Sequence, residues 1–503
     1  MIRIFQTSLL VLCILGGGMS KAQSKNTLLD QGFWKSKPEV ETVKAEIAKG
    51  NNPAQFNEMS FDPTVIAINN DAPNATIKFL LDQEGNSIKK VTHDSRIYLH
   101  WAANKGNVEI VEYLLAKGSD INAEDSHSLT PIAFAANNGQ SNVAVYESFF
   151  KAGLDPKKKY KEGATLLLMA IPNDKDLTLT NYFISKGLSL TETDANGNTA
   201  FNYAARSGNV QFLKTLKQKG VKYTDNALIF AAQGTRRAAN TLEIYQYLID
   251  ELKVKPTVTN KEGETVLHIL ARKPNQSEII KYFLDKGVDV TKTDKEGNTA
   301  LLNAAAGRDV AAVETLLPKV KNINTVNTKG ESALTMAVKS GSADMVSLLL
   351  NKGADANVKD KDGNTLAYYL VQSYRPQNAR GGFAGQGPDD FSAKLKILQD
   401  NKLDFSAPQA GNNSLYHVAV TKNDVALLKA LSSLNINVNT KNKEGVTPLH
   451  KAAMISKDDS MLKYLLSIGA QKDITTEFDE TAYALAKENE FFTKNNISVE
   501  FLR

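Results

Sequence analysis

Cysteine and histidine are scarce in this sequence. The 503 residues include one cysteine, Cys13, and six histidines. One cysteine forms no intrachain disulfide, and so few thiol and imidazole groups make a metal site, with its three or four converging ligands, unexpected. The net charge of +5 is small for this length, so no domain is strongly basic and nucleic acid is not an expected partner.

Long apolar runs and catalytic signatures are also missing. Downstream of residue 22, no run reaches the roughly 20 apolar residues that span a bilayer, so we expect no integral membrane segment there. No GxSxG or HExxH motif occurs, and the glycine-rich stretch 381–387 lacks the Lys-Ser/Thr ending of a phosphate-binding loop. Because no segment outside the repeats described below could form a separate catalytic domain, we expect no enzyme activity, no cofactor and no metal.

The first 22 residues have the pattern of a signal peptide. Arg3 precedes an apolar run at 8–19, and Ser20 and Ala22 place small residues at the −3 and −1 positions of a cleavage site. The run is shorter than a membrane span, although an uncleaved anchor is the other interpretation. We expect cleavage after Ala22 and export to the periplasm, with secretion as the alternative.

The remainder of the chain repeats with a period near 33 residues. Taking Thr447 as a marker, most equivalent positions lie 33 to 35 residues apart, and a step of 49 after Thr365 indicates an insertion at 374–391. Such a period is typical of a stacked solenoid rather than of separate globular domains. The markers are Thr64, Ile97, Thr130, Thr165, Thr199, Asn226, Thr265, Thr299, Ser332, Thr365, Ser414, Thr447 and Thr481.

Each repeat carries the same local signals. A glycine stands two residues before many markers, as in KEG, NG and DG sequences that suit turns with positive φ. An alanine recurs five residues after the marker, where a small side chain lets neighbouring helices approach closely. Runs such as VEIVEYLLAKG then show helical spacing and end in a glycine, for example Gly118, Gly287 and Gly353. The predicted unit is a turn, a helix, a short loop, a second helix and a glycine stop.

The sequences GVTPLHKAA, SLTPIAFAANNG and GNTAFNYAARSG, with KGADANVKD and KGSDINAED, resemble ankyrin repeats. The resemblance implies an all-α ankyrin-repeat solenoid of about twelve helix-turn-helix units with short hairpin fingers and a cap at each end. We expect a signal peptide at 1–22, an N-terminal capping half-repeat at 23–58, the repeat array at 59–476 and a C-terminal cap at 477–503. The unit around Asn226 departs from the pattern because it lacks the finger glycine.

Four of the six histidines occupy the third position after a marker, namely His100, His268, His417 and His450. In ankyrin repeats this position usually holds a histidine whose ring binds the neighbouring loop. The resemblance therefore implies a structural role for these histidines, in place of metal binding or general base catalysis.

The resemblance also implies where a partner would bind, because ankyrin proteins contact partners through finger residues and residues seven and eight past the marker. On this concave surface the candidate protein-binding residues are Asn104, Lys105, Asn137, Asn138, Asn198, Arg206, Glu264, Arg272, Lys273, Asn298, Glu331 and Lys339. Many of these polar side chains could equally serve only to keep the fingers soluble. The insertion adds Arg375, Arg380 and Phe383 as a second candidate contact, because arginine and aromatic side chains often anchor interfaces.

These features favour an exported, non-catalytic scaffold that is monomeric alone and binds another protein of unknown identity. Support or protection of an envelope enzyme is the more specific hypothesis. The alternative is a secreted effector or toxin-related protein that acts on another cell.

Overall fold

The computed structural model describes residues 26–235, 239–376 and 390–503. They form two compact units, of which the first extends to Ala135 and includes Asn142–Leu154, and the second comprises Ala136–Ser141 and Asp155–Arg503. The signal-peptide segment, Arg380 and Phe383 lie outside the described residues. Within the described ranges, no helix is both long and apolar enough to cross a bilayer.

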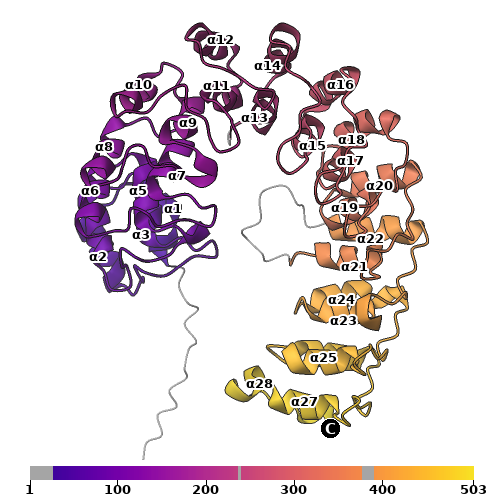
Figure 1. The fold of residues 1–503 in the computed structure, drawn as a ribbon. Coiled ribbons are helices and arrows are strands. Elements are labelled where there is room, and N and C mark those ends of the chain that lie inside the picture. The colour runs from indigo at the N-terminus through magenta and orange to yellow at the C-terminus, as the bar shows by residue number, and fades with distance from the viewer. Residues whose placement is uncertain (1–25, 236–238, 377–389) are drawn as a thin grey trace, which may run out of the picture. The chain divides into compact units, whose positions relative to one another are not determined.

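Pairs of short helices account for most of the described chain, which is therefore all-α, as predicted (Figure 1). The first helices of twelve successive pairs in the described ranges are α3 (Pro63–Asn69), α5 (Tyr98–Lys105), α7 (Pro131–Asn137), α9 (Leu166–Ala170), α11 (Ala200–Ala204), α13 (Ala227–Gln233), α15 (Val266–Leu270), α17 (Ala300–Ala305), α19 (Ala333–Lys339), α21 (Leu366–Ser373), α23 (Leu415–Val420) and α25 (Pro448–Ile455). The second helices are α4 (Asn74–Leu81), α6 (Val108–Ala116), α8 (Val143–Lys151), α10 (Thr178–Ser185), α12 (Val210–Gln218), α14 (Leu242–Gln246), α16 (Ser277–Asp285), α18 (Val310–Leu316), α20 (Ala343–Asn351), α22 (Asp390–Asp400), α24 (Val425–Leu431) and α26 (Ser460–Ser467).

Shorter helices stand at the two ends of the array. The N-terminal end has α1 (Gln31–Lys35) and α2 (Val40–Ala48), and the C-terminal end has α27 (Ala482–Glu488) and α28 (Glu490–Lys494). Helix α1 has five residues and is followed by the nine-residue α2.

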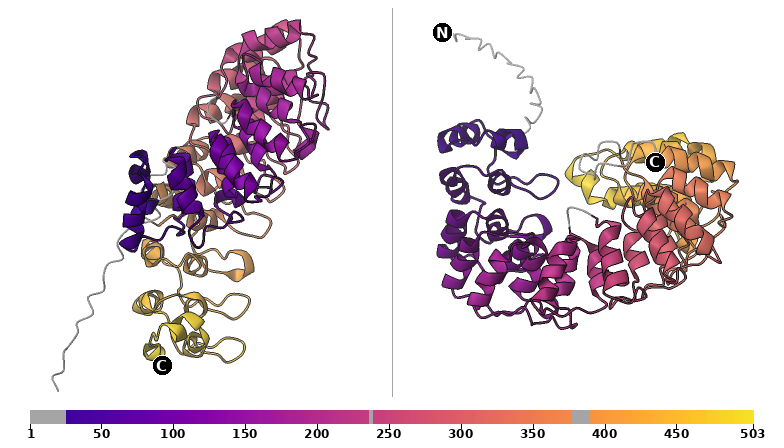
Figure 2. Two further views of the ribbon diagram at one scale, coloured as in Figure 1. Left: turned by 90° about the vertical axis from the view of Figure 1, so that its left-hand side faces the viewer. Right: turned by 90° about the horizontal axis from the view of Figure 1, so that it is seen from above.

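Neighbouring pairs stack helix on helix. First helices contact first helices, as α17 contacts α19 and α19 contacts α21, and second helices contact second helices, as α16 contacts α18. Figure 2 shows the C-terminal pairs nearly end on, each with its finger projecting on the same side. Extended pairing in the described residues is limited to isolated bridges at finger bases, such as Thr193 with Thr199.

Several of the predicted markers begin first helices and cap them through a side-chain hydroxyl group. Thr299 and Ser332 each accept a hydrogen bond from the backbone N–H three residues on, which is otherwise unpaired in the first helical turn. The alanines five residues after the markers are buried; Ala204 and Ala337, for example, have no exposed surface. The small side chain at this position therefore lies inside the stack, as expected.

The marker assigned to Thr64 is wrong by two residues. Helix α3 begins at Pro63, and the cap is Asp62, whose carboxylate accepts a hydrogen bond from the N–H of Val65. The buried Ala67 then falls five residues after the cap, as in the other units. The sequence frame shifted because aspartate caps a helix as well as threonine does.

The fingers turn at the predicted glycines. Gly297 and Gly330 have φ values of 78° and 81°, and where glycine is missing, Ser128 and Asp479 adopt the same left-handed conformation at the corresponding position. The N–H of Thr328 donates to the carbonyl of Glu296 in the preceding finger at 2.8 Å. Equivalent bonds join several other neighbouring fingers, so their backbones form a ladder.

One finger is missing at the unit of Asn226, and this changes the fingers on either side. Lys261 forms an ion pair and hydrogen bond with Glu162, a residue three units earlier in the chain. Asn196, from the intervening finger, donates to the other carboxylate oxygen of Glu162 at 3.2 Å. The irregular unit therefore lets fingers meet that a regular array would keep apart.

Candidate protein-binding surface

Four histidines stand at the third position after a marker, and each connects its own repeat to the next one. The ring Nδ1 atoms of His268, His417 and His450 each accept from the backbone N–H of the helix cap at 3.1 Å. Their Nε2 atoms each lie 2.9 Å from a carbonyl oxygen of the following loop, such as Asn298 O for His268. His100 bonds in the same way to Ile97 N and Leu129 O. The structural role predicted for these residues is thus seen in their bonds.

These contacts fix the neutral ring. A donor faces Nδ1 and an acceptor faces Nε2, so only the tautomer with hydrogen on Nε2 satisfies both. The four rings are at most 1% exposed. Burial lowers the pKa of His100 and His417 to about 4, against the ordinary value near 6.5.

Asn202 replaces the histidine in one unit. Its Oδ1 accepts from the Thr199 hydroxyl at 3.1 Å and from the backbone N–H of Thr224 at 3.1 Å. Its amide group donates to the Thr224 hydroxyl at 2.5 Å. An uncharged amide can therefore make the same connection between a helix start and the next loop.

The candidate finger residues are used mainly inside the chain. Asn198 is 6% exposed; its side chain donates to Asp194 and accepts from Asn226. Asn298 likewise donates to Asp294 and accepts from Asn327. Their amides therefore connect neighbouring fingers to one another.

Glu264 and Glu331 each form an ion pair with a basic side chain of the same repeat. Arg272 Nη1 lies 2.5 Å from Glu264 Oε1, and Lys339 Nζ lies 2.8 Å from Glu331 Oε1. Burial alone would raise the pKa of Glu331, but hydrogen bonds from Asn327 and Lys339 bring it below its usual value. These acidic residues hold the side chains of Arg272 and Lys339 toward the fingers.

The other candidates occupy several separate places. Lys105 forms an ion pair with Asp71 at 2.9 Å, Asn137 is exposed, and Asn104 and Asn138 are half-buried. Arg375 is exposed, and its guanidinium lies near backbone carbonyls at the end of α21.

One cleft gathers several cationic side chains in the second compact unit. It has a volume of about 440 Å³ and lies between the loop that follows α15 and the loop that joins α17 to α18. Its lining residues are Ala271, Arg272, Lys273, Pro274, Asn275, Gly307, Arg308, Asp309 and Val310. Arg272 and Lys273 were candidates from the sequence, whereas Arg308 was missed because it lies nine residues past its marker, outside the expected positions.

A bridge connects this cleft to Arg206. The side-chain oxygen of Gln233 accepts from Arg206 Nη2 at 2.9 Å, and the backbone oxygen of Gln233 accepts from Lys273 Nζ at 2.5 Å. The Arg206 guanidinium also stacks on the rings of Tyr203 and Phe230. Thus three of the predicted residues, Arg206, Arg272 and Lys273, are brought close together by the fold.

Electrostatic repulsion accompanies this grouping. Burial lowers the pKa of Lys273, and the positive charges of Arg272 and Arg206 lower it further. Burial also lowers the pKa of Arg206, whose buried Nε has no hydrogen-bond acceptor among the described residues. An anion that approaches these side chains would stabilise their charged forms.

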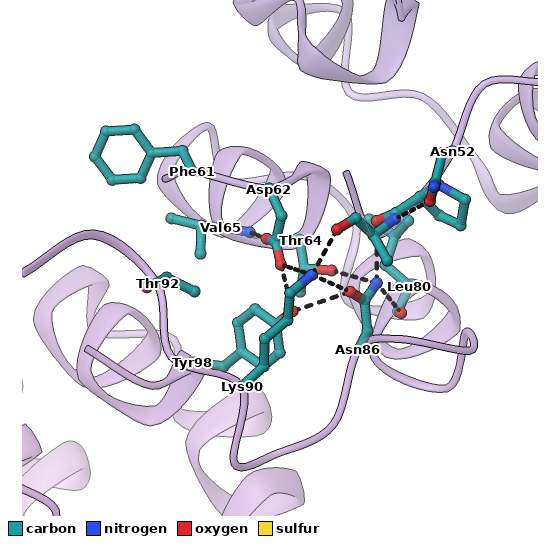
Figure 3. A network of polar contacts seen from close by, with 12 residues as sticks. Asn52, Phe61, Asp62, Thr64, Val65, Leu80, Asn86, Lys90, Thr92 and Tyr98 are labelled. Atoms are coloured by element: carbon teal, nitrogen blue, oxygen red, sulfur yellow. Dashed lines mark hydrogen bonds and ion pairs between the residues drawn. The ribbon is translucent and has the colours of Figure 1, made fainter. Parts of the chain in front are cut away.

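A buried polar network in the first compact unit has a different character (Figure 3). Asp62 accepts from the Tyr98 hydroxyl at 2.5 Å and pairs with Lys90 Nζ at 2.7 Å. Lys90 also donates to Asn86 Oδ1, and the Tyr98 hydroxyl oxygen lies 3.1 Å from the same atom. Burial and the neighbouring Asp62 raise the pKa of Tyr98. These bonds connect the start of α3 with the loop at 86–90 and with α5, so we interpret the network as structural.

No three His, Cys, Asp or Glu side chains gather as a metal-ligand set within residues 26–235, 239–376 and 390–503.

Family models for ankyrin repeats match most of the chain. The model for ankyrin repeats in three copies matches residues 39–125, 64–146, 132–227, 228–327 and 301–380, and the model for many copies matches 416–466. The chain belongs to the ankyrin-repeat family. This family is generally an interaction module, so its members bind other proteins through the repeats.

Curated relatives share the repeats at low identity. The human transient receptor potential cation channel subfamily A member 1 is 23% identical over 404 residues, which cover 76% of this chain and 34% of the channel. A putative ankyrin repeat protein of Rickettsia bellii is 28% identical over 148 residues, 29% of this chain and 72% of that protein.

Among solved structures, the human ASB11 ankyrin repeat domain matches 46% of this chain at 25% identity, with a TM-score of 0.37. The chain spans only about a third of the channel's length, and so these similarities concern the repeats.

Proposed function

We propose that this protein is an exported, non-catalytic scaffold that binds another protein through its fingers and the C-terminal ends of its first helices. The observation that carries the proposal is the ladder of bonds between fingers. Backbone hydrogen bonds join successive tips, as from Lys295 to Glu262 and from Lys361 to Lys329, each at 2.9 Å. A surface that is already ordered loses little conformational entropy when a partner binds.

The composition of this surface supports a protein partner rather than a small apolar ligand. Exposed tip residues such as Lys295 and Glu296 are charged, whereas large apolar side chains are mostly buried between the helices. Mixed charge with hydrogen-bonding groups is typical of the surfaces of non-obligate protein complexes.

The signal-peptide pattern at 1–22 supports export, and the periplasm is the location that we propose for the scaffold. There, binding to an envelope enzyme would protect or position that enzyme. Cell fractionation tests this part: recovery in the periplasmic fraction supports it, and recovery in the cytosol contradicts it.

Site-specific photo-cross-linking in living cells tests the binding surface. A photoreactive amino acid at Glu296, on a finger, or at Asn137, at the end of a first helix, should capture one protein. The same amino acid at Lys281, which is 69% exposed on the second helix α16, is the matched control. Capture mainly from Lys281 would contradict the surface, and no capture from any position would contradict a scaffold function.

A further inference from the structure

The side chains that line the cleft beside Arg272 carry more positive than negative charge. Three of its lining side chains are cationic, Arg272, Lys273 and Arg308, and one is anionic, Asp309. The Asp309 carboxylate is already engaged, because its oxygens accept from the backbone N–H groups of Asn275 at 2.7 Å and Ala312 at 3.3 Å. Asp309 therefore has a structural task as a helix cap and turn former.

The two arginines keep donors for a ligand. Arg272 uses Nη1 for Glu264, and Arg308 uses Nη1 for Asp390 at 2.9 Å. Each guanidinium has five N–H donors, so most remain for another acceptor. Both side chains stay accessible, with 46% of Arg272 and 44% of Arg308 exposed.

We propose that this cleft receives an acidic segment of the protein partner, with Asp or Glu carboxylates paired to Arg272, Lys273 and Arg308. This inference rests on the proposed function. A guanidinium binds a carboxylate through two parallel hydrogen bonds, which gives such a pair directional strength. The apolar lining of Ala271, Pro274 and Val310 provides a low-polarity wall against which these pairs are partly shielded from water.

Neighbouring cations strengthen the same preference. Gln233 holds Lys273 and Arg206 on its two oxygens, and no described carboxylate makes an ion pair with either cation within 4.0 Å. Burial lowers the pKa of Lys273 and repulsion from Arg272 and Arg206 lowers it further, and a negative charge that enters the cleft would offset both effects. The cleft thus binds an anion with a more favourable free energy than a single exposed lysine does.

The observations favour an acidic peptide over a nucleic acid or a lipid surface. Carboxylates of Glu264, Asp309 and Asp390 lie among or next to the cations, and they would repel the uniformly charged backbone of a nucleic acid. A peptide places its carboxylates only at intervals, so it can meet the cations and avoid these anions. The cleft is also concave, because two loops form its sides, whereas a membrane-binding face is flat.

A fluorescently labelled peptide of ten residues with alternating Glu and Ser tests the proposal directly. Binding to the full chain is measured by fluorescence anisotropy at about 50 and about 300 mM NaCl, conditions that screen exposed charges very differently. The test variant is Arg272→Gln with Lys273→Gln. The matched control is Lys157→Gln with Lys159→Gln, which removes the same charge from an exposed finger.

We expect the test variant to weaken peptide binding at least about tenfold and the control to weaken it less than about twofold, because only the first removes charged donors from the cleft. Arg308→Gln should weaken peptide binding to a similar extent. Arg272→Lys keeps the positive charge and should therefore weaken binding less than the test variant does. Circular dichroism melting identifies a variant that has lost its fold, and the remaining cleft variant then decides the result.

Equal loss in the test and control variants would overturn the proposal, because it would show binding to net charge alone. Absence of peptide binding at low salt would overturn it too. Tighter binding to phosphatidylglycerol vesicles or to a ten-nucleotide DNA, lost in the cleft variant, would assign the cleft to that other class of ligand. Photo-cross-linking of a partner that persists unchanged in Arg272→Gln/Lys273→Gln would leave the scaffold function standing and refute only the acidic segment.

Discussion

Acidification from pH 7 to pH 5 should destabilise the stack of repeats through His100 and His417. Both have a pKa of about 4 in the folded chain, below the value near 6.5 that an unfolded histidine has. Between these two values the unfolded chain binds protons and the folded chain does not. The stabilisation is therefore complete above about pH 6.5 and falls as the pH decreases toward 4.

The size of the effect follows from the two pKa values. At pH 5, an unfolded histidine is almost fully protonated, whereas these buried rings are almost entirely neutral. This difference lowers the free energy of unfolding by about 2 kcal/mol for each ring, relative to neutral pH. The two together cost about 4 kcal/mol, a substantial part of the stability of an ordinary domain. The physical source is burial, together with a ring Nδ1 that faces a backbone N–H and cannot accept a proton without losing that bond.

The chain supplies its own control for this prediction. Asn202 makes the equivalent connection without a titratable group, so a His100→Asn/His417→Asn variant should keep the fold with a weaker connection. Urea unfolding at pH 7, 6 and 5 compares this variant with the unchanged chain. We expect the variant to be less stable at pH 7 but to lose much less stability on acidification.

The test compares how steeply the free energy of unfolding falls with pH in the two proteins. Carboxylates titrate equally in both, so a difference in slope is due to the histidines. Parallel pH profiles for the two proteins would refute the assignment of depressed pKa values to these histidines. A steeper profile in the variant would do so as well.

Two further predictions concern the fingers and the buried network. Gly330→Ala should cost about 2–4 kcal/mol, because its Cβ would lie 2.8 Å from Lys361 N in a left-handed backbone, whereas Gly363→Ala has no atom within 4 Å and should cost only about 1–2 kcal/mol. Equal losses by thermal unfolding would contradict this. Asp62→Asn removes the anion beside the largely buried Lys90 and should cost about 3 kcal/mol. Lys90→Met added to Asp62→Asn should restore part of that loss, and a fully additive double variant would count against the pair.

Much of the fold could be predicted because its signals are local. The turn at Gly330 needs a positive φ, the helix cap at Ser332 needs a hydroxyl group, and the buried position 337 needs a small side chain. The residues of each repeat therefore specify its local structure. The frame failed at Thr64 because Asp62 is also a good cap and proline follows it. The alanine at 67 was the signal that would have corrected it.

The candidate binding surface was harder to predict because it depends on contacts between repeats. Asn198 and Glu331 fit the family positions for partner binding, yet their side chains tie together groups within the chain. Arg308 joined the cleft only through the approach of two loops from successive units. The contact between Glu162 and Lys261 likewise depends on a missing finger between them. No local pattern contains this information.

Hydrogen–deuterium exchange of the chain, free and with its cross-linked partner, tests most directly whether the finger side of the repeats binds a protein. We predict slower exchange in the finger at 260–264 and in the cleft loops at 271–275 and 307–309, with no change on the second helices α16 and α18. Protection confined to α16 and α18, or no protection anywhere, would contradict binding through this surface.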